Sequence, residues 1–175
     1  TTLMDRITVY NARARVDESA ASLIAHEMAH QWWGDVLTCK DWRHLWLNES
    51  FASYFDPLYF EYANGVDEFR NQMYQAQMAG VNTDKQLGRK PIVSVGSYGA
   101  NIYPRGASVL HMLRFVLGDT LFWRSINQYI TKNQFRPVET NDLKRAVEET
   151  TGQNLYWFFD QWVYKAGYPK FEVTY

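Results

Sequence analysis

The stretch that decides the fold is HEMAHQWWGD at residues 26–35, which begins with an H-E-x-x-H motif. Apolar residues around the motif recur at helical spacing, which predicts a helix from about Glu18 to Gly34. Residues four apart on a helix are separated by about 400°, so His26 and His30 lie about 40° apart around the axis. Their Cβ atoms are then roughly 5–6 Å apart. The motif therefore predicts two ligands of one metal ion.

Zinc binds histidine nitrogens at about 2.0–2.1 Å, and a catalytic zinc site keeps one of its four positions for water. Two histidines therefore leave one protein ligand to be found elsewhere in the chain. Glu27 is rotated by about 100° from His26 around the helix, so it can reach the water without being a ligand. That placement suits a general base. The alternative is a helix with two surface histidines and a solvated glutamate.

We expect the third ligand on a neighbouring helix, and Glu49 is the best candidate. Its sequence neighbours from Trp46 to Ala52 are mostly apolar, and a carboxylate is costly in such surroundings unless it is paired or bound to a metal. An antiparallel helix pair joined by a modest loop would bring it beside the two histidines. The alternative is a glutamate at a helix start, favoured there by the helix dipole.

Composition places the chain among single globular domains. It has 175 residues, of which 46% are hydrophobic and 21% are charged, with a net charge of -1. These values exclude a disordered tail or a low-complexity linker, and without a basic block we expect no nucleic-acid partner. The single cysteine, Cys39, excludes an internal disulfide. No apolar run is long enough for a transmembrane helix.

Hydrophobic periodicity and helix caps predict a mainly α fold with strand fragments at both ends. The stretches 35–44 and 81–100 are expected to be irregular, and Pro57 is expected to kink or split the helix that contains it. We expect further helices over 45–62, 67–80, 104–117, 120–130, 141–151 and 155–165, and strands at 7–10 and 171–175.

The two motifs together resemble the gluzincin zinc aminopeptidases, the family of aminopeptidase N and leukotriene hydrolase. The resemblance rests on HEMAHQWWGD at 26–35, eighteen intervening residues after His30, and WLNE ending at Glu49. It implies the helical part of a thermolysin-like metallopeptidase catalytic domain. It also implies that His26, His30 and Glu49 bind Zn²⁺ and that Glu27 activates water.

A second segment, IYPRGASVLHML at residues 102–113, resembles the family segment that carries a catalytic tyrosine. The resemblance assigns that role to Tyr103, whose hydroxyl would donate to the oxyanion formed during peptide hydrolysis. From the residues alone, Tyr103 is equally well explained as a packed aromatic beside a helix start. Tyr98 lies where some family members also have a tyrosine near the site.

The chain departs from the family pattern at two positions near these motifs. Ser50 stands where the family usually has Gly, and Arg105 stands where it usually has Lys. The family's Gly-x-Met-Glu-Asn motif, whose glutamate holds the substrate's α-amino group, is absent upstream of His26. We therefore expect residues 1–167 to be a catalytic domain truncated on its N-terminal side. Residues 168–175 are expected to begin a following β-rich domain.

Other chemistry-bearing residues receive less specific interpretations. His44 is expected to be a surface histidine rather than part of a substrate edge, and His111 to be packed or solvated. Cys39 is interpreted as structural. The tryptophans at 32, 33, 42 and 46 are interpreted as core rather than as a substrate pocket. Asp35 or Asp41 could hydrogen-bond a metal ligand without touching the metal, and the sequence does not choose between them.

These observations predict a zinc metallo-aminopeptidase that removes N-terminal residues from peptides, working together with other domains of the same protein. A zinc hydrolase of another specificity, such as an endopeptidase or an epoxide hydrolase, and a non-catalytic scaffold of the same fold are the alternatives. The 175 residues alone are expected to have little or no activity. The sequence identifies no substrate-binding residue and no cellular compartment.

Overall fold

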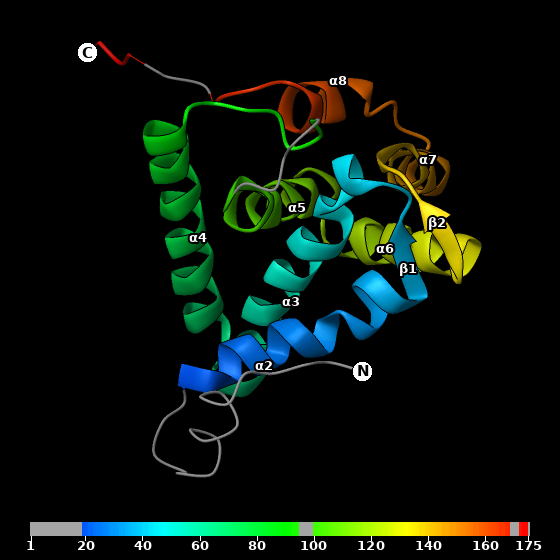
Figure 1. The fold of residues 1–175 in the computed structure, drawn as a ribbon, viewed down its shortest axis with the longest axis horizontal. Helices are drawn as coiled ribbons and strands as arrows, with labels where there is room; N and C mark the ends of the chain where they lie inside the picture. Colours follow the sequence, from blue (N-terminus) through cyan, green and yellow to red (C-terminus); the bar gives the residue numbers. More distant parts are fainter. Residues whose placement is uncertain (1–18, 95–99, 169–171, 175) are drawn as a thin grey trace.

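The computed structural model describes residues 19–94, 100–168 and 172–174, and this part of the chain is mostly helical, with two short strands (Figure 1). The predicted fold class is confirmed. No described helix is both long enough and apolar enough to cross a membrane. The elements, in chain order, are α2 (Ser19–Ala29), η1 (Gln31–Val36), β1 (Leu37–Cys39), η2 (Trp42–His44), α3 (Trp46–Asn64), α4 (Val66–Leu87), η3 (Ala100–Ile102), α5 (Pro104–Leu117), α6 (Asp119–Asn133), β2 (Arg136–Val138), α7 (Thr140–Thr151), α8 (Tyr156–Phe159) and η4 (Asp160–Tyr164).

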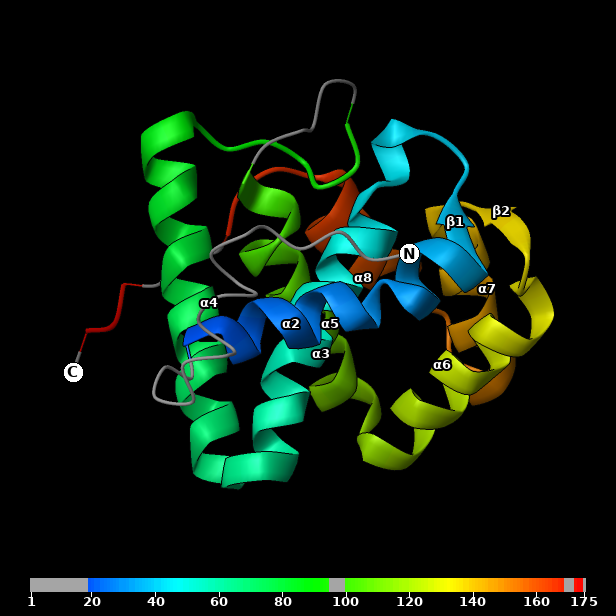
Figure 2. The same ribbon diagram turned by 60° about the horizontal axis from the view of Figure 1, so that its bottom comes forward.

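Helix α3 forms the centre of the fold, with α2, α4 and α5 all packed against it (Figures 1 and 2). Its buried face carries Phe51, Ala52 and Tyr54, which are fully removed from solvent. Phe51 stacks on Trp33, which follows α2, with ring centroids 4.1 Å apart. Burying large aromatic side chains in this way is strongly stabilising. Helices α2 and α3 are therefore held rigidly against each other.

A two-stranded parallel sheet joins two segments that lie about 100 residues apart in the sequence. Leu37 of β1 pairs with Arg136 of β2, and the register continues to Cys39 and Val138. The expectation of an irregular loop over 35–44 is therefore wrong. Strands of three residues carry almost no periodicity signal, and β1 takes its partner from a distant part of the sequence. The sheet places the start of α7 beside the segment between α2 and α3 (Figure 1).

Several predicted helix boundaries need correction. Helix α3 continues through the buried Pro57 and is not split. Helix α4 runs from Val66 to Leu87, well beyond the predicted end at Gly80. A Cβ on Gly80 would lie 3.4 Å from Arg105, so this glycine permits close helix packing and does not end the helix.

Helix α2 ends at Ala29, before the predicted stop, and is followed by the kinked turn η1 over Gln31–Val36, in which Trp33 and Gly34 have non-helical backbone angles. Gly34 lies within that turn with φ 157° and ψ -53°, a conformation available to glycine alone. The predicted strand at 7–10 and Tyr98 lie outside the described residues, as do Phe171 and Tyr175 at the ends of the other predicted strand. Residues 172–174 have no regular secondary structure.

Candidate metal centre

The candidate site lies between α2 and α3, which run in opposite directions past each other. Ser22 near the start of α2 hydrogen-bonds Asp56 in the middle of α3, with 2.5 Å between the oxygens. One to two turns further along α2, His26 and His30 face Glu49 near the start of α3. The antiparallel packing therefore brings together the three residues that the sequence proposed as metal ligands.

The three ligand atoms form a nearly equilateral triangle. The Nε2 atoms of His26 and His30 are 3.2 Å apart. Glu49 Oε2 lies 3.5 Å from His26 Nε2 and 3.3 Å from His30 Nε2. Ligand bonds of about 2.0–2.1 Å in tetrahedral geometry separate ligand atoms by about 3.3–3.4 Å. One face of a zinc tetrahedron therefore fits this triangle, with its fourth corner left open.

Hydrogen bonding directs the lone pairs of the triangle toward one another. His30 Nδ1 lies 2.9 Å from the Trp33 carbonyl oxygen, which can only accept, so Nδ1 carries a hydrogen. In a neutral ring, Nε2 is then an unprotonated acceptor that faces the Glu49 carboxylate and the other imidazole. Acceptors at such distances repel unless a cation or a proton lies between them. The carbonyl that fixes this ring orientation is a usual partner of a metal-binding histidine.

Without a metal, the same groups favour charged forms. The hydrogen bond to Glu49 raises the pKa of His30 above its ordinary 6.5, although burial opposes the shift. Burial alone would raise the pKa of Glu49, but hydrogen bonds from His26 and His30 lower it to about 2. The carboxylate is therefore ionised at neutral pH, and positive charge between it and the imidazoles is stabilised. Either a proton or a divalent cation can supply that charge.

Tyr103 and Glu27 lie at the edge of the same cluster. The Tyr103 ring stacks on the His26 ring with centroids 6.1 Å apart, and 39% of the tyrosine is exposed. Burial raises the pKa of Tyr103, and the negative charges of Glu49 and Glu27 raise it further. The phenol therefore keeps its proton at neutral pH and can donate a hydrogen bond. Glu27 follows His26 on α2 and is half-buried.

A further carboxylate near the triangle is Asp56, which the sequence interpretation missed. Asp56 accepts from Ser22 and interacts electrostatically with His26, and burial raises its pKa. It lies seven residues after Glu49, two helical turns on the same face of α3, which is the signal that could have identified it. Neither predicted candidate takes this place. Asp35 is exposed, and Asp41 pairs with Arg43, with 2.7 Å between Oδ2 and Nη2.

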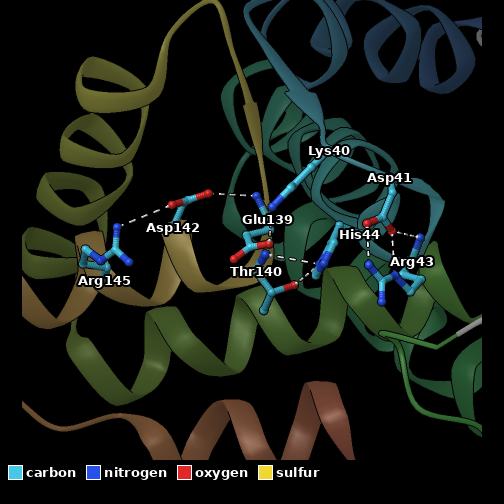
Figure 3. Close-up of polar contacts among 8 residues, drawn as sticks. All are labelled: Lys40, Asp41, Arg43, His44, Glu139, Thr140, Asp142 and Arg145. Atoms are coloured by element: carbon cyan, nitrogen blue, oxygen red, sulfur yellow. Dashed lines mark hydrogen bonds and ion pairs between the residues drawn. The ribbon is translucent and has the colours of Figure 1, made fainter.

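His44 is buried, which corrects the expectation of a surface histidine, and it contacts Thr140 (Figure 3). Its Nδ1 lies 3.0 Å from the Thr140 hydroxyl, which also accepts from the indole N–H of Trp46 at 2.9 Å. The expected loop is in fact β1 and η2, which carry His44 under the start of α7. His44 therefore has a structural role and does not reach the triangle.

Some of the remaining sequence interpretations agree with the structure and others do not. His111 is packed, as expected, with its ring 5.3 Å from that of Phe69 and its Nδ1 3.4 Å from the Tyr54 hydroxyl. Cys39 is a partly buried free thiol in β1. Two of the four tryptophans are core residues, and the other two, Trp32 and Trp42, are more than half exposed.

The profile of the peptidase family M1 domain matches residues 1–162. The chain belongs to peptidase family M1. The resemblance to the gluzincin aminopeptidases is therefore confirmed. This M1 chain is 33% identical over 165 residues to glutamyl aminopeptidase of Sus scrofa, covering 89% of the chain and 18% of that protein. It is 30% identical over 174 residues to aminopeptidase N of Lactococcus lactis subsp. lactis, covering 91% of the chain and 20% of that protein. The chain thus spans about a fifth of the length of these curated relatives.

Solved structures of M1 proteins have the same fold. The M1 zinc metallopeptidase of Deinococcus radiodurans matches with a TM-score of 0.73 and 30% identity, over 85% of this chain and 34% of that one. A mutant of that enzyme bound to a Tyr-Ser-Ala substrate matches with a TM-score of 0.70 and 30% identity, over 81% and 32%. Yeast LTA4 hydrolase matches in fold, with a TM-score of 0.78 at 22% identity, over 90% and 28%.

Proposed function

We propose that the protein containing this M1 chain is a zinc aminopeptidase, with the metal held by His26, His30 and Glu49. The observation that carries the proposal is the triangle of ligand atoms with sides of 3.2–3.5 Å. Its donor set of two imidazoles and one carboxylate is the set that zinc peptidases use. Membership of family M1 and the aminopeptidase relatives support the same conclusion.

Bound in the triangle, zinc would polarise the scissile carbonyl and lower the pKa of the attacking water to about 7. Glu27 accepts the proton of the attacking water and passes it to the leaving amine. Tyr103 donates a hydrogen bond from its hydroxyl to the negative charge that develops on the carbonyl oxygen. Its raised pKa keeps that hydrogen in place at neutral pH. The negative charge of Asp56 acts on His26 from α3.

Replacing Glu27 with Gln tests this assignment, since glutamine keeps the shape of the side chain but cannot accept a proton. In the natural polypeptide that contains these residues, kcat on aminoacyl-anilides should fall by about 10²–10⁴-fold, with one zinc per chain retained. Glu68→Gln, a matched change in the first turn of α4, should leave kcat unchanged. Full turnover by the Glu27→Gln variant would contradict the proposal.

Substrate class separates the aminopeptidase from other zinc hydrolases with the same metal site. We propose that substrates need a free α-amino group, in line with the relatives named aminopeptidases. Yeast LTA4 hydrolase shares the fold, and so an epoxide substrate is the second candidate. Paired assays with free and N-acetylated versions of one peptide decide between aminopeptidase and endopeptidase. Equal cleavage of both versions would overturn the aminopeptidase proposal.

We also propose that other domains complete the enzyme, since the chain spans about a fifth of the relatives' length. In this proposal, residues 1–167 form part of the catalytic domain and residues 168–175 begin the next one. The isolated 175-residue chain should bind zinc yet hydrolyse aminoacyl-anilides far more slowly than the natural polypeptide. Equal turnover by the two would show that these residues suffice for activity.

A further inference from the structure

The turn that carries Tyr103 is fixed by its neighbours. η3 leads into the first residue of α5, and Tyr103 is the N-cap between them. Asn101, Ile102 and Arg105 around it are at most 8% exposed, whereas Tyr103 itself is 39% exposed. The position of the phenol therefore depends on how firmly the buried part of the turn is held.

One of the groups that hold this turn is Ser50, the residue directly after Glu49. Its side chain is fully buried, and its hydroxyl donates a hydrogen bond to the carbonyl oxygen of Ile102. That carbonyl belongs to the peptide group whose nitrogen is the backbone nitrogen of Tyr103. The Ser50 hydroxyl therefore fixes the peptide plane from which Tyr103 projects.

Helices α3 and α5 approach closely at this point. A Cβ on Gly106 would overlap both the hydroxyl and the Cβ of Ser50, so the absence of a side chain at 106 makes room for the serine. Ser50 and Gly106 together set the spacing between the helix that presents Glu49 and the turn that presents Tyr103.

The far side of the turn has an anchor of its own. Asn101 donates from Nδ2 to Asp84 Oδ1 of α4 at 2.9 Å, and Arg105 lies 3.7 Å from the other oxygen of the same buried carboxylate. Arg105 also donates to backbone carbonyls, those of Lys90, Lys165 and Gly167. The turn therefore stays folded without the Ser50 hydroxyl, and the loss of that hydroxyl frees chiefly the peptide between Ile102 and Tyr103.

We propose that Ser50 is a positioning residue for Tyr103, coupling the α3 segment that carries Glu49 to the hydroxyl that stabilises the oxyanion. The inference rests on the proposed function and deepens it. Without the hydroxyl, the Ile102 carbonyl loses its buried partner, and the Tyr103 peptide is free to rotate in search of another donor. The phenol then spends less time within reach of the oxyanion.

A kinetic experiment compares Ser50→Ala with Ser125→Ala in the zinc-loaded natural polypeptide. Ser125 is the matched control because it is also fully buried, and it donates to the Leu121 carbonyl within α6. Ser50→Ala should lower kcat by about tenfold with KM and zinc content unchanged, and Ser125→Ala should not lower kcat. Ser50→Gly is the second variant and should show the same loss.

The double variant separates positioning from general structural damage. If Ser50 acts through Tyr103, then Ser50→Ala combined with Tyr103→Phe is no slower than Tyr103→Phe alone. The proposal would be overturned if the decreases in kcat caused by Ser50→Ala and Tyr103→Phe multiplied in the double variant. It would also be overturned if Ser50→Ala and Ser50→Gly had the same kcat as Ser125→Ala.

A measurement without catalysis keeps this inference separate from the proposed function. With 3-fluorotyrosine at position 103, the ¹⁹F resonance of the chain should shift or broaden in Ser50→Ala and stay unchanged in Ser125→Ala. An unchanged resonance in Ser50→Ala would refute the positioning role even if the enzyme proves to be an aminopeptidase. A shifted resonance in a chain without hydrolytic activity would leave the positioning of Tyr103 intact and refute only the proposed function.

Discussion

Two clusters in this molecule each contain histidine but differ in their chemistry. One is the triangle of His26, His30 and Glu49 between α2 and α3. The other joins His44, Thr140 and Trp46 where the segment after β1 meets α7. Each cluster connects side chains from different helices and contains imidazole nitrogens at hydrogen-bonding distance from oxygen.

The His44 cluster pairs hydrogen-bond donors with acceptors. The Thr140 hydroxyl accepts from Trp46 Nε1 and donates to His44 Nδ1, which also accepts from the Thr140 backbone N–H at 3.3 Å. Burial lowers the pKa of His44, in agreement with a neutral ring. These contacts are balanced without a metal ion, and we expect the cluster to contribute to stability.

In the triangle, by contrast, two imidazole Nε2 atoms and a carboxylate oxygen converge on one point, and all three are acceptors when the two rings are neutral and Nδ1-protonated. The clusters teach that burial does not mark a histidine proposed as a metal ligand here, since His44 is more buried than either His26 or His30. The mismatch of donors and acceptors marks it instead, because such a mismatch is costly unless a cation resolves it.

The largest expected effect comes from removing one imidazole from each cluster. His30→Ala should weaken zinc binding by more than about 100-fold, because changes even behind the ligands of a metal cost about 10–100-fold. His44→Ala should leave zinc affinity within about twofold, since it shares no partner with the triangle. Competition with a chromophoric chelator measures both constants. Wild-type affinity in His30→Ala would abolish the distinction between the clusters.

Thr140→Val should affect stability and leave zinc binding unchanged. The substitution leaves the indole N–H of Trp46 buried without an acceptor, which costs about 1–3 kcal/mol of unfolding free energy. Thr150→Val on the same helix is the control, because Thr150 donates only to the Ala146 carbonyl of its own helix, and it should cost less than about 0.5 kcal/mol. Urea titration gives both values. Equal costs would mean that the His44 cluster adds nothing to stability.

Asp56→Asn tests whether support for the triangle comes from α3. Removing this charge near His26 should weaken zinc binding by about tenfold, whereas Asp41→Asn should leave zinc affinity unchanged because Asp41 pairs with Arg43. The same chelator competition measures both variants. A larger loss of zinc affinity in Asp41→Asn than in Asp56→Asn would show that Asp41, one of the two candidates from the sequence, supports the site instead.

The smallest expected effect is a pH dependence of stability from His44. Because its folded pKa lies below the ordinary 6.5, the unfolded chain binds more protons as the pH falls through 6.5. Neutral His44 thus contributes fully to the unfolding free energy above about pH 6.5, and this contribution is lost as the pH falls toward the pKa of His44 in the folded chain. The unfolding free energy should therefore decrease more between pH 7 and pH 5 in the wild type than in His44→Gln. A steeper fall in the variant would show that His44 is charged in the fold.

Local signals were sufficient to predict the helices that begin and end on strong caps. Helix α5 runs from Pro104 to Leu117 before Gly118, as proline in the first turn and glycine after the last predicted. The spacing of His26, His30 and Glu49 likewise anticipated the proximity of these side chains, since it depends on one helix and the next.

Features set by distant contacts were not predictable. β1 and β2 are three residues each and pair only because the helices between them return the chain. His44 is buried by Thr140, 96 residues away, and Gly80 continues its helix because Arg105 of another helix packs against it. The anchoring of Tyr103 by Ser50 also crosses two helices. No local pattern records these contacts.

The most direct test of the central claim is an anomalous-difference map at the zinc edge from zinc-loaded crystals, combined with metal analysis. We expect one zinc per chain and a single peak about 2.0–2.1 Å from His26 Nε2, His30 Nε2 and Glu49 Oε2. A peak elsewhere, or a Glu49 side chain turned to solvent with no metal bound, would contradict it.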